Sequence, residues 1–239
     1  RIWAKLIKNK YNSSNEKSMK LRFHTQTAGF SLTAQQPENN ITRTAFQAMA
    51  AVLGGTQSLH TNSMDETLAL PSEKAAEIAL RTQQVLAFET GVTNVVDPLG
   101  GSWYLEEITN KMEKAAFDYF EKIDLNGGVV ESIEKGYLQK EIADASSEYN
   151  DKVESNDRVI VGVNQFSKKD EKIDIPILKI SKDVENEQIS VLNNIRKNRD
   201  SKLVRQKLKN LEKACKTNQN LVPIIIDAVL EYATLGEIV

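Results

Sequence analysis

His24 and His60 are the only histidines in the chain, and each lies in a short run of small polar residues. His24 opens HTQTAGF (24–30), and His60 lies within TQSLHTN (56–62). Imidazole serves as an acid–base catalyst near neutral pH and as a metal ligand. No carboxylate or thiol lies inside either run, so we predict that neither histidine binds a metal.

The composition argues against several classes of protein. The chain has 239 residues, a net charge of -2 and 40% hydrophobic residues, which suffices for one large domain or two small ones. No apolar run approaches the ~20 residues of a transmembrane helix, and no basic stripe is present to bind nucleic acid. The single cysteine, Cys215, and the absence of a recognisable leader favour the cytoplasm. Helical spacing already at Ile2, with no Met or cap before it, indicates a piece of a longer protein.

The hydrophobic pattern of the first hundred residues predicts strands alternating with helices. We expect a helix from residue 2 and then a strand over 19–26. We expect a helix capped by Asn39-Asn40 and ended by Gly54-Gly55, a strand over 56–62, and a helix from Pro71-Ser72 to Gly91. Short links between such elements are typical of a parallel α/β layout.

The rest of the chain is predicted to be mainly helical. The patterns indicate helices over 105–122 and 129–150 separated by Gly127-Gly128, a strand over 157–163, an extended surface linker over 167–186, and helices over 186–216 and 222–233 with Pro223 in the first turn. The linker is rich in Lys, Asp and Glu and has few apolar anchors, Ile173 among them.

Both predicted strands carry one unusually polar face. Arg22, His24 and Gln26 share a face of the first strand, opposite Leu21 and Phe23. Ser58, His60 and Asn62 share a face of the second. Parallel barrels normally fill their interior with branched aliphatic residues, and an unpaired buried polar group costs about 1–3 kcal/mol. A solvated strand end or a satisfied polar core explains one such face, whereas two neighbouring ones favour a ligand.

The segment HTQTAGFSLTAQQPENNITRTAFQAMAAVLGGTQSLHTNSMDETLALPSEKAAEIALRTQQV (24–85) closely resembles the cobalamin-dependent acyl-CoA mutases of the methylmalonyl-CoA mutase family. The resemblance continues through DPLGGSWYLEE (97–107) and DRVIVGVNQF (157–166) to YATLGEI (232–238). It covers nearly the whole chain and is weakest over 167–215.

This resemblance implies a catalytic (β/α)8 TIM barrel whose lumen holds the pantetheine chain of an acyl-CoA. Residues 1–105 would form the last barrel strands and helices, 106–166 a helical extension with a short strand, and 167–239 a linker and terminal helices leading towards a cobalamin domain. The implied cofactor is adenosylcobalamin, but the D-x-H-x-x-G motif that supplies the cobalt ligand is absent here. The remainder of the barrel, a cobalamin-binding domain or small subunit, and a homo- or heterodimer partner are implied as well.

The resemblance also assigns site residues. The catalytic chamber would include Gln26 and His24, with His60 in or beside it. The resemblance implies that the cofactor is bound by Gly29, Asn62, Glu66 and Ala69. It implies that the CoA tail is bound by Lys17 and Gln57. The sequence by itself favours Glu66 as an acid at a helix start over a ligand contact, and the resemblance reverses this preference. Without the resemblance, Lys17 is a surface lysine and Gly29 a turn residue.

The implied reaction is a radical 1,2-rearrangement, with (R)-methylmalonyl-CoA to succinyl-CoA as the default. Isobutyryl-CoA and 2-hydroxyisobutyryl-CoA are alternative substrates, and a non-catalytic subunit-docking scaffold is an alternative from a different class. Retention of Gln26, Asn62 and Glu66 argues against the scaffold, because docking needs none of them. We expect this chain alone to be inactive.

Overall fold

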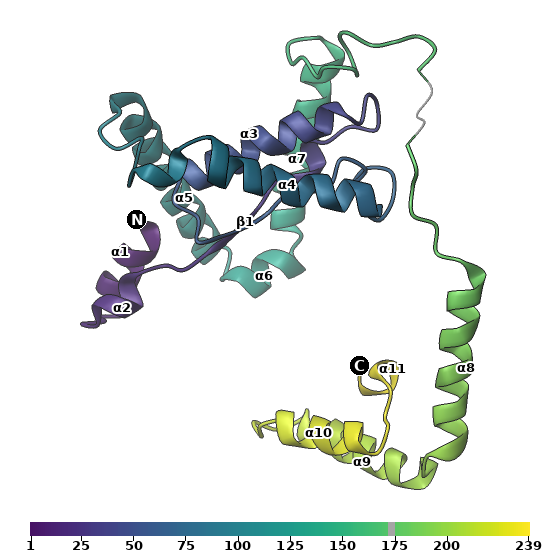
Figure 1. Cartoon of the computed structure of the whole chain (residues 1–239). Coiled ribbons are helices and arrows are strands. Elements are labelled where there is room, and N and C mark those ends of the chain that lie inside the picture. Colours follow the sequence, from purple (N-terminus) through teal and green to yellow (C-terminus); the bar gives the residue numbers. More distant parts are fainter. Residues whose placement is uncertain (172–174) are drawn as a thin grey trace. The chain divides into compact units, whose positions relative to one another are not determined.

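The structure, a computed structural model, describes residues 1–171 and 175–239 (Figure 1). The chain divides into two compact units, Arg1–Leu178 and Lys179–Val239, and each is considered by itself. The division into segments 1–105, 106–166 and 167–239 stays a prediction.

The first unit consists mainly of helices around a small sheet. Its elements are α1 (Ile2–Asn9), α2 (Glu16–Met19), β1 (His24–Gln26), the 3-10 turn η1 (Gly29–Ser31), α3 (Asn39–Leu53), β2 (Ser58–His60), α4 (Glu73–Glu89), the 3-10 turn η2 (Val92–Asn94), α5 (Trp103–Leu125), α6 (Val129–Glu134) and α7 (Tyr137–Glu154). The predicted order strand, helix, strand, helix is present in β1, α3, β2 and α4. Within the described residues the sheet has two strands, so a closed barrel is not seen.

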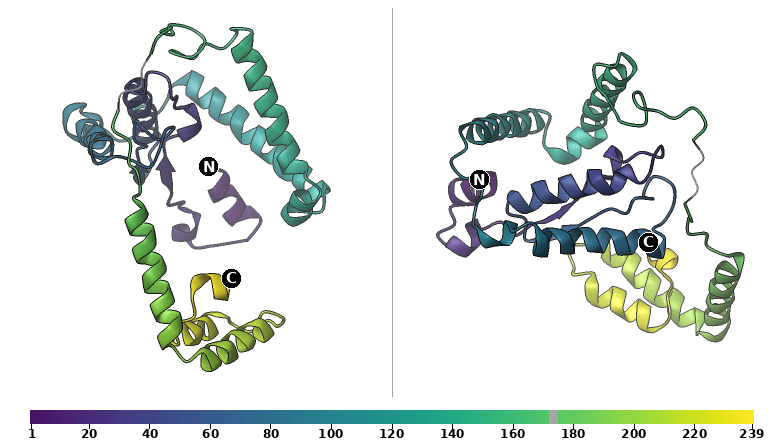
Figure 2. Two further views of the ribbon diagram at one scale, coloured as in Figure 1. Left: turned by 90° about the vertical axis from the view of Figure 1, so that its right-hand side faces the viewer. Right: turned by 45° about the horizontal axis from the view of Figure 1, so that its top comes forward.

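The two strands are parallel neighbours. Their register pairs His24 with Ser58, Thr25 with Leu59, and Gln26 with His60. In each strand the central residue is half-buried and its two neighbours are exposed. Helices α3 and α4 pack against each other along this sheet (Figure 2). Gln83 of α4 donates from Nε2 to the Leu59 carbonyl at 3.1 Å, which ties the helix to β2.

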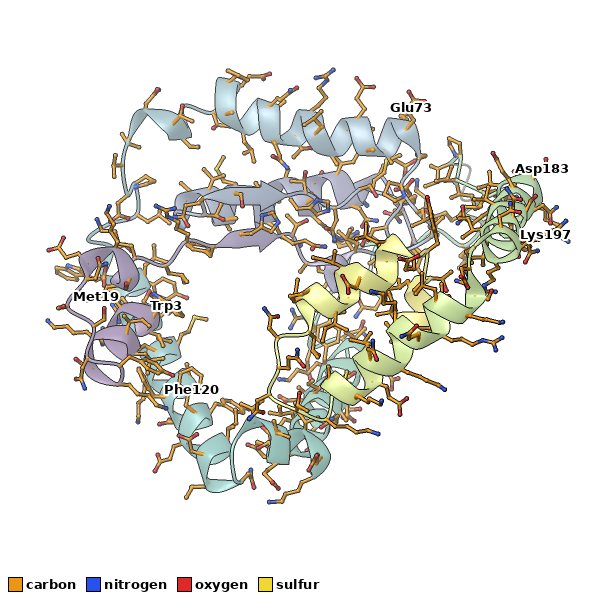
Figure 3. All side chains as sticks on the ribbon, turned by 90° about the horizontal axis from the view of Figure 1, so that it is seen from below. Trp3, Met19, Glu73, Phe120, Asp183 and Lys197 are labelled. Carbon is orange, nitrogen blue, oxygen red and sulfur yellow. The ribbon has the colours of Figure 1, made fainter. Side chains whose placement is uncertain are left out.

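The strand predicted over 19–26 is wrong in its first part, because β1 begins only at His24. Residues Glu16–Met19 form a helical turn, and the Asn15 side chain caps it by accepting from the Lys17 N–H at 2.9 Å. This turn packs on α1, where Trp3 Nε1 donates to the Ser18 carbonyl at 2.9 Å (Figure 3). The apolar residues between this turn and β1 do not pack under helices, since Leu21 and Phe23 are 49% and 39% exposed.

The cap of helix α3 differs from the predicted one, whereas α4 begins as predicted. Glu38 occupies the cap position of α3, and the second Asn of the expected cap, Asn40, is fully buried inside the helix. Ser72 caps α4 by accepting from the Ala75 N–H at 3.3 Å. Gly91 follows α4 with a φ of 72°, a conformation that glycine tolerates and that ends the helix as predicted.

Two predictions for residues 129–163 are wrong. The helix expected over 129–150 is two helices, α6 and α7, because Gly136 has a φ of 71° between them. Residues 157–163 form an irregular segment, with one isolated bridge between Val161 and Gln165 and a φ of 84° at Gly162.

The second unit is a small helical cluster. It contains α8 (Lys182–Asn198), α9 (Ser201–Ala214), α10 (Val222–Leu230) and α11 (Leu235–Ile238). Its core is Val204, Ala228 and Ala233, with Leu208 and Ile238 packed against them. Pro223 lies in the first turn of α10 as predicted.

The helix predicted over 186–216 is divided by an extended residue, Arg199. Asp200 then starts α9, because its carboxylate accepts from the N–H groups of Lys202 and Leu203 at 2.9 and 3.0 Å. Of the linker predicted over 167–186, residues 167–171 and 175–181 form no helix or strand, and α8 begins at Lys182. Ile173 lies outside the described residues.

Candidate functional site

Four of the predicted site residues meet where the chain leaves β1 and β2. Gln26 Nε2 donates to Asn62 Oδ1 at 3.2 Å, which links the end of one strand to the loop after the other. A Cβ placed on Gly29 would lie 3.0 Å from Asn62 Nδ2 and 3.6 Å from Glu66 Oε1. We call Gln26, Gly29, Asn62 and Glu66 the strand-end cluster. It lies at the carboxyl ends of parallel strands, where α/β proteins carry their ligands.

The loop that follows β2 is buried although it is polar. Residues 61–65 are all buried, with Asn62 2% and Asp65 0% exposed, and Glu66 is the first exposed residue after them. Asn62 Nδ2, Ser63 Oγ and Asp65 Oδ1 find no hydrogen-bond partner among the described residues. A buried polar atom left in this state costs about 1–3 kcal/mol. These polar atoms of the loop are therefore able to form hydrogen bonds with a bound ligand.

Hydrogen bonds beyond the strand ends fix the backbone of this loop. The Thr27 N–H donates to the His60 carbonyl at 3.1 Å, and Thr27 Oγ1 accepts from the Asn62 N–H at 2.9 Å. Asp65 Oδ2 accepts from the Ser72 N–H at 2.9 Å. Sequence reasoning missed Thr27 and Asp65, which carry no recognisable motif of their own.

The polar faces of the two strands are side by side, as predicted. His24 Nδ1 lies 2.7 Å from Ser58 Oγ across the sheet, and Gln26 and His60 are the next pair on the same exposed face. Among the described residues, no three His, Cys, Asp or Glu side chains are grouped as a metal site would require. The absence of a metal at His24 and His60 stays a prediction.

The other three assigned residues are not members of the strand-end cluster. Ala69 is half-buried, and its N–H donates to the Asp65 carbonyl at 3.1 Å. Gln57 precedes β2 at the opposite end of the sheet, where its Oε1 accepts from the Phe23 N–H at 2.9 Å. Lys17 lies in the exposed turn α2, also before β1.

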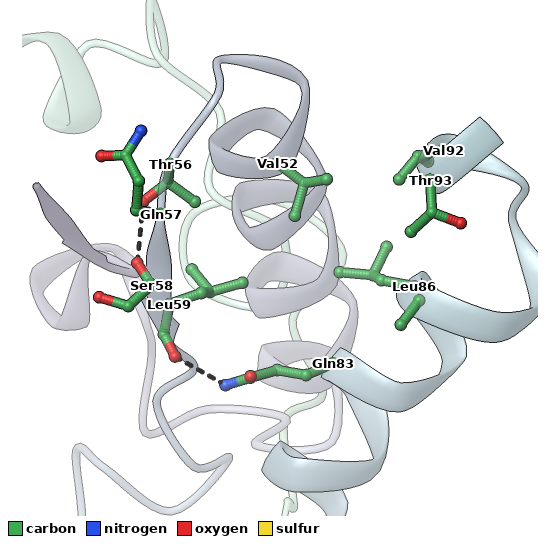
Figure 4. A pocket seen from close by; sticks show the side chains of 10 residues that line it. Val52, Thr56, Gln57, Ser58, Leu59, Gln83, Leu86, Val92 and Thr93 are labelled. Atoms are coloured by element: carbon green, nitrogen blue, oxygen red, sulfur yellow. Dashed lines mark hydrogen bonds between the residues drawn. The ribbon is translucent and has the colours of Figure 1, made fainter. Parts of the chain in front are cut away.

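A small pocket of about 200 Å³ opens beside the amino-terminal end of β2 (Figure 4). Its walls come from α3, β2, α4 and η2 and are largely apolar, with Val52, Leu59, Leu86 and Val92 prominent. Gln57 and Ser58 also line it, but no member of the strand-end cluster does. The pocket is thus separate from the cluster.

The fold and the site define the chain as a strand–helix–strand–helix segment of an α/β protein with a polar site after its parallel strands. The family profile described as methylmalonyl-CoA mutase matches residues 1–239. The chain belongs to the methylmalonyl-CoA mutase family, which confirms the resemblance found in the sequence.

Similar proteins extend across this whole chain. It is 43% identical over 240 residues to a 2-hydroxyisobutanoyl-CoA mutase large subunit of Aquincola tertiaricarbonis, covering 100% of this chain and 43% of that protein. It is 41% identical over 238 residues to the methylmalonyl-CoA mutase of Escherichia coli, covering 99% and 33%. The human mitochondrial methylmalonyl-CoA mutase is 41% identical over 240 residues, covering 100% and 32%. The chain thus spans less than half the length of these relatives, which are isomerases.

Proposed function

We propose that this chain is part of an adenosylcobalamin-dependent acyl-CoA mutase that interconverts a branched acyl-CoA and its isomer by a radical 1,2-rearrangement. The observation that carries the proposal is the strand-end cluster, because four residues assigned from the resemblance come together at the carboxyl ends of two parallel strands. The barrel that would enclose them is part of the proposal.

The residues present fit the adenosyl part of the cofactor. The buried Asn62 Nδ2 has no hydrogen-bond partner in the part of the chain that the structure describes, and the Glu66 carboxylate lies exposed near it as an acceptor. Gly29 provides space where a Cβ would approach both side chains. A ribose carries hydroxyl groups that both donate and accept, so an amide and a carboxylate together can bind it.

When bound, adenosylcobalamin supplies the carbon radical that starts the rearrangement, so the chain needs no strong nucleophile. Glu66 would accept from the ribose hydroxyls, Asn62 would donate beside it, and Ala69 would add a further contact. Gln26 Nε2 donates to Asn62 Oδ1 and so orients that amide, and we propose Gln26 as a residue of the catalytic chamber. His24 belongs to the same polar face through Ser58, and we keep it as a chamber residue.

For the acyl-CoA, we propose that the tail passes Lys17 and Gln57 at the other end of the sheet. The reactive group would then lie near the strand-end cluster. (R)-methylmalonyl-CoA is the default substrate. 2-Hydroxyisobutyryl-CoA is a specific alternative, because a relative 43% identical to this chain bears that activity in its name. Isobutyryl-CoA is a further alternative.

The partners proposed are the remainder of the catalytic barrel and a cobalamin-binding domain or small subunit, in a homo- or heterodimer. The names of two relatives contain "large subunit", which supports a subunit partner. Among the described residues, no helix is both long and apolar enough to cross a membrane. A cytoplasmic location stays a prediction, since several relatives are named as mitochondrial.

Glu66→Gln in the assembled enzyme tests the proposal. The substitution keeps the shape of the side chain but removes its charge, and a charge-assisted hydrogen bond contributes about 1.5–3 kcal/mol. We expect adenosylcobalamin affinity to fall about 10–100-fold, turnover to fall with it, and the KM for acyl-CoA to change little. Isothermal titration with the cofactor, steady-state kinetics and a thermal melt on one preparation provide the three readouts.

Glu73→Gln is the matched control, because Glu73 is likewise an exposed acid but lies in the first turn of α4, outside the strand-end cluster. The structure places Glu66 in a turn and not at a helix start. If Glu66 contributes only to local stability, both variants will show a slightly lower melting temperature and normal cofactor affinity. That result would remove Glu66 from the site.

A further inference from the structure

Asn40 is fully buried in α3, and its side chain uses all of its hydrogen-bonding groups. Its Oδ1 accepts from the Thr33 N–H at 3.0 Å and from Arg43 Nη1 at 2.8 Å. Its Nδ2 donates to the Thr33 carbonyl at 2.8 Å and to the Met64 carbonyl at 2.9 Å. One amide thereby connects the Thr33 backbone, the Met64 backbone and the Arg43 side chain.

The two carbonyls belong to different loops of the candidate site. Thr33 lies in the connection between β1 and α3, the first part of which (residues 27–33) we call the first loop, and this loop contains Gly29. Met64 lies in the loop after β2, the second loop (residues 61–66), between Asn62 and Glu66. Asn40 Nδ2 bridges these loops directly.

Two further residues on the same face of α3 hold the same loops. Gln47 Nε2 donates to Ser31 Oγ at 2.6 Å, and its Oε1 accepts from the Ala28 N–H at 2.5 Å. Thr44 Oγ1 lies 3.5 Å from the Asn62 carbonyl. Positions 40, 44 and 47 follow helical spacing, so α3 presents one polar stripe to both loops.

The distance between the loops matters at Gly29. A Cβ there would already be 3.0 Å from Asn62 Nδ2, so small shifts of either loop change the space beside Asn62 and Glu66. The bonds from Asn40 fix the first loop at Thr33 and the second loop at Met64, and these are the loops that carry Gly29 and Asn62.

We propose that Asn40 is a positioning residue that sets the spacing of the two loops and thereby the shape of the cofactor site. This proposal rests on the function proposed above. Asn40 does not touch the cofactor itself and acts through the first and second loops.

Asn40→Asp is the test, because it keeps the size of the side chain and its acceptor while it removes both donor bonds. In the cofactor-free protein, we expect faster amide hydrogen exchange in peptides covering the first and second loops. In the assembled enzyme, we expect adenosylcobalamin affinity to fall about tenfold or more, with the KM for acyl-CoA within about twofold of the parent. Asn40→Ala, which introduces no charge, is made in parallel in case the aspartate variant does not fold.

Asn39→Asp is the matched control, because the Asn39 amide donates to Gln36 Oε1 and to neither loop. The proposal is overturned if Asn40→Asp or Asn40→Ala lowers only the melting temperature and leaves loop exchange and cofactor affinity as in the control. If the parent enzyme binds no cobalamin at all, the proposed function fails. Loop exchange in the cofactor-free protein still decides the positioning role of Asn40.

Discussion

Gly29 is the residue that permits the close approach of the two loops at the candidate site. Its φ is not in the left-handed region, so the backbone does not require glycine there. The requirement is spatial, because a Cβ would meet Asn62 Nδ2 at 3.0 Å and Glu66 Oε1 at 3.6 Å. A methyl group would occupy the space that the proposed cofactor contact needs.

Gly29→Ala in the assembled enzyme is therefore expected to fold normally and to bind adenosylcobalamin about tenfold more weakly, which corresponds to about 1.4 kcal/mol. Titration with the cofactor and a thermal melt measure the two effects. Gly236→Ala is the control, since a Cβ there meets nothing within 4 Å. Unchanged affinity in Gly29→Ala would show that this space is not used by the ligand.

At the residue scale, the sequence identified the strand-end cluster only through the resemblance. Alternation alone predicted the polar faces of His24 and Ser58, which the register of the sheet confirms. The sequence could not reveal the role of Asn40 between the loops, because Asn is common at helix caps and the adjacent residues Asn39 and Asn40 indicated a cap. The bonds from Asn40 to Thr33 and Met64 depend on the tertiary fold.

At the element scale, periodicity predicted the helices and the parallel strands but not where they break. The segment DRVIVGV (157–163) indicated a strand, yet the Asn164 side chain binds backbone groups that a strand partner would need. Its Oδ1 accepts from the Ile160 N–H at 2.7 Å, and its Nδ2 donates to the Arg158 carbonyl at 2.7 Å. Such side-chain bonds compete with sheet formation, and a pattern of hydrophobic residues does not reveal them.

Helix α11 is connected to the break between α8 and α9 by an ion pair. Arg199 Nη1 donates to Glu237 Oε2 at 2.6 Å, and the Arg199 side chain is only 8% exposed. Thr234 and Glu237 also form a capping box. The Arg199 guanidinium, followed by the Thr234 N–H, holds the pKa of Glu237 far below its ordinary value.

A depressed carboxylate pKa makes the stability of the second unit depend on pH. Its contribution is fully present above the unfolded pKa of about 4.3 and is lost as pH falls towards the lower folded value. We expect the free energy of unfolding to fall by about 1–3 kcal/mol between pH 6 and strongly acidic solution. Hydrogen exchange of residues 234–239 over this pH range measures the change.

Glu237→Gln should be less stable at neutral pH and should have lost most of this pH dependence. Glu231→Gln, which changes a half-buried carboxylate in the same unit, should keep it. An identical acid profile for Glu237→Gln and the parent would mean that other groups cause the loss of stability.

At the scale of the whole molecule, the sequence predicted the order of elements but could not predict how a barrel closes. Closure depends on strands that pair with both edges of the sheet, and the described residues contain only β1 and β2. The first unit also leaves large apolar side chains exposed, with Phe30 81%, Phe88 84% and Trp103 92% accessible. Such exposure is typical of surfaces that other parts of a protein cover.

The 239-residue chain by itself is therefore expected to show no mutase turnover. Two short strands cannot enclose the acyl-CoA, and an open parallel sheet with exposed apolar side chains favours aggregation. The measurement is turnover of methylmalonyl-CoA and 2-hydroxyisobutyryl-CoA by the purified chain with added adenosylcobalamin, together with light scattering and binding of a hydrophobic dye. The intact Escherichia coli relative serves as the positive control for the assay. Turnover by a monodisperse preparation of the chain alone would contradict this expectation, because it would mean that β1, β2 and the helices around them suffice to shelter the reaction.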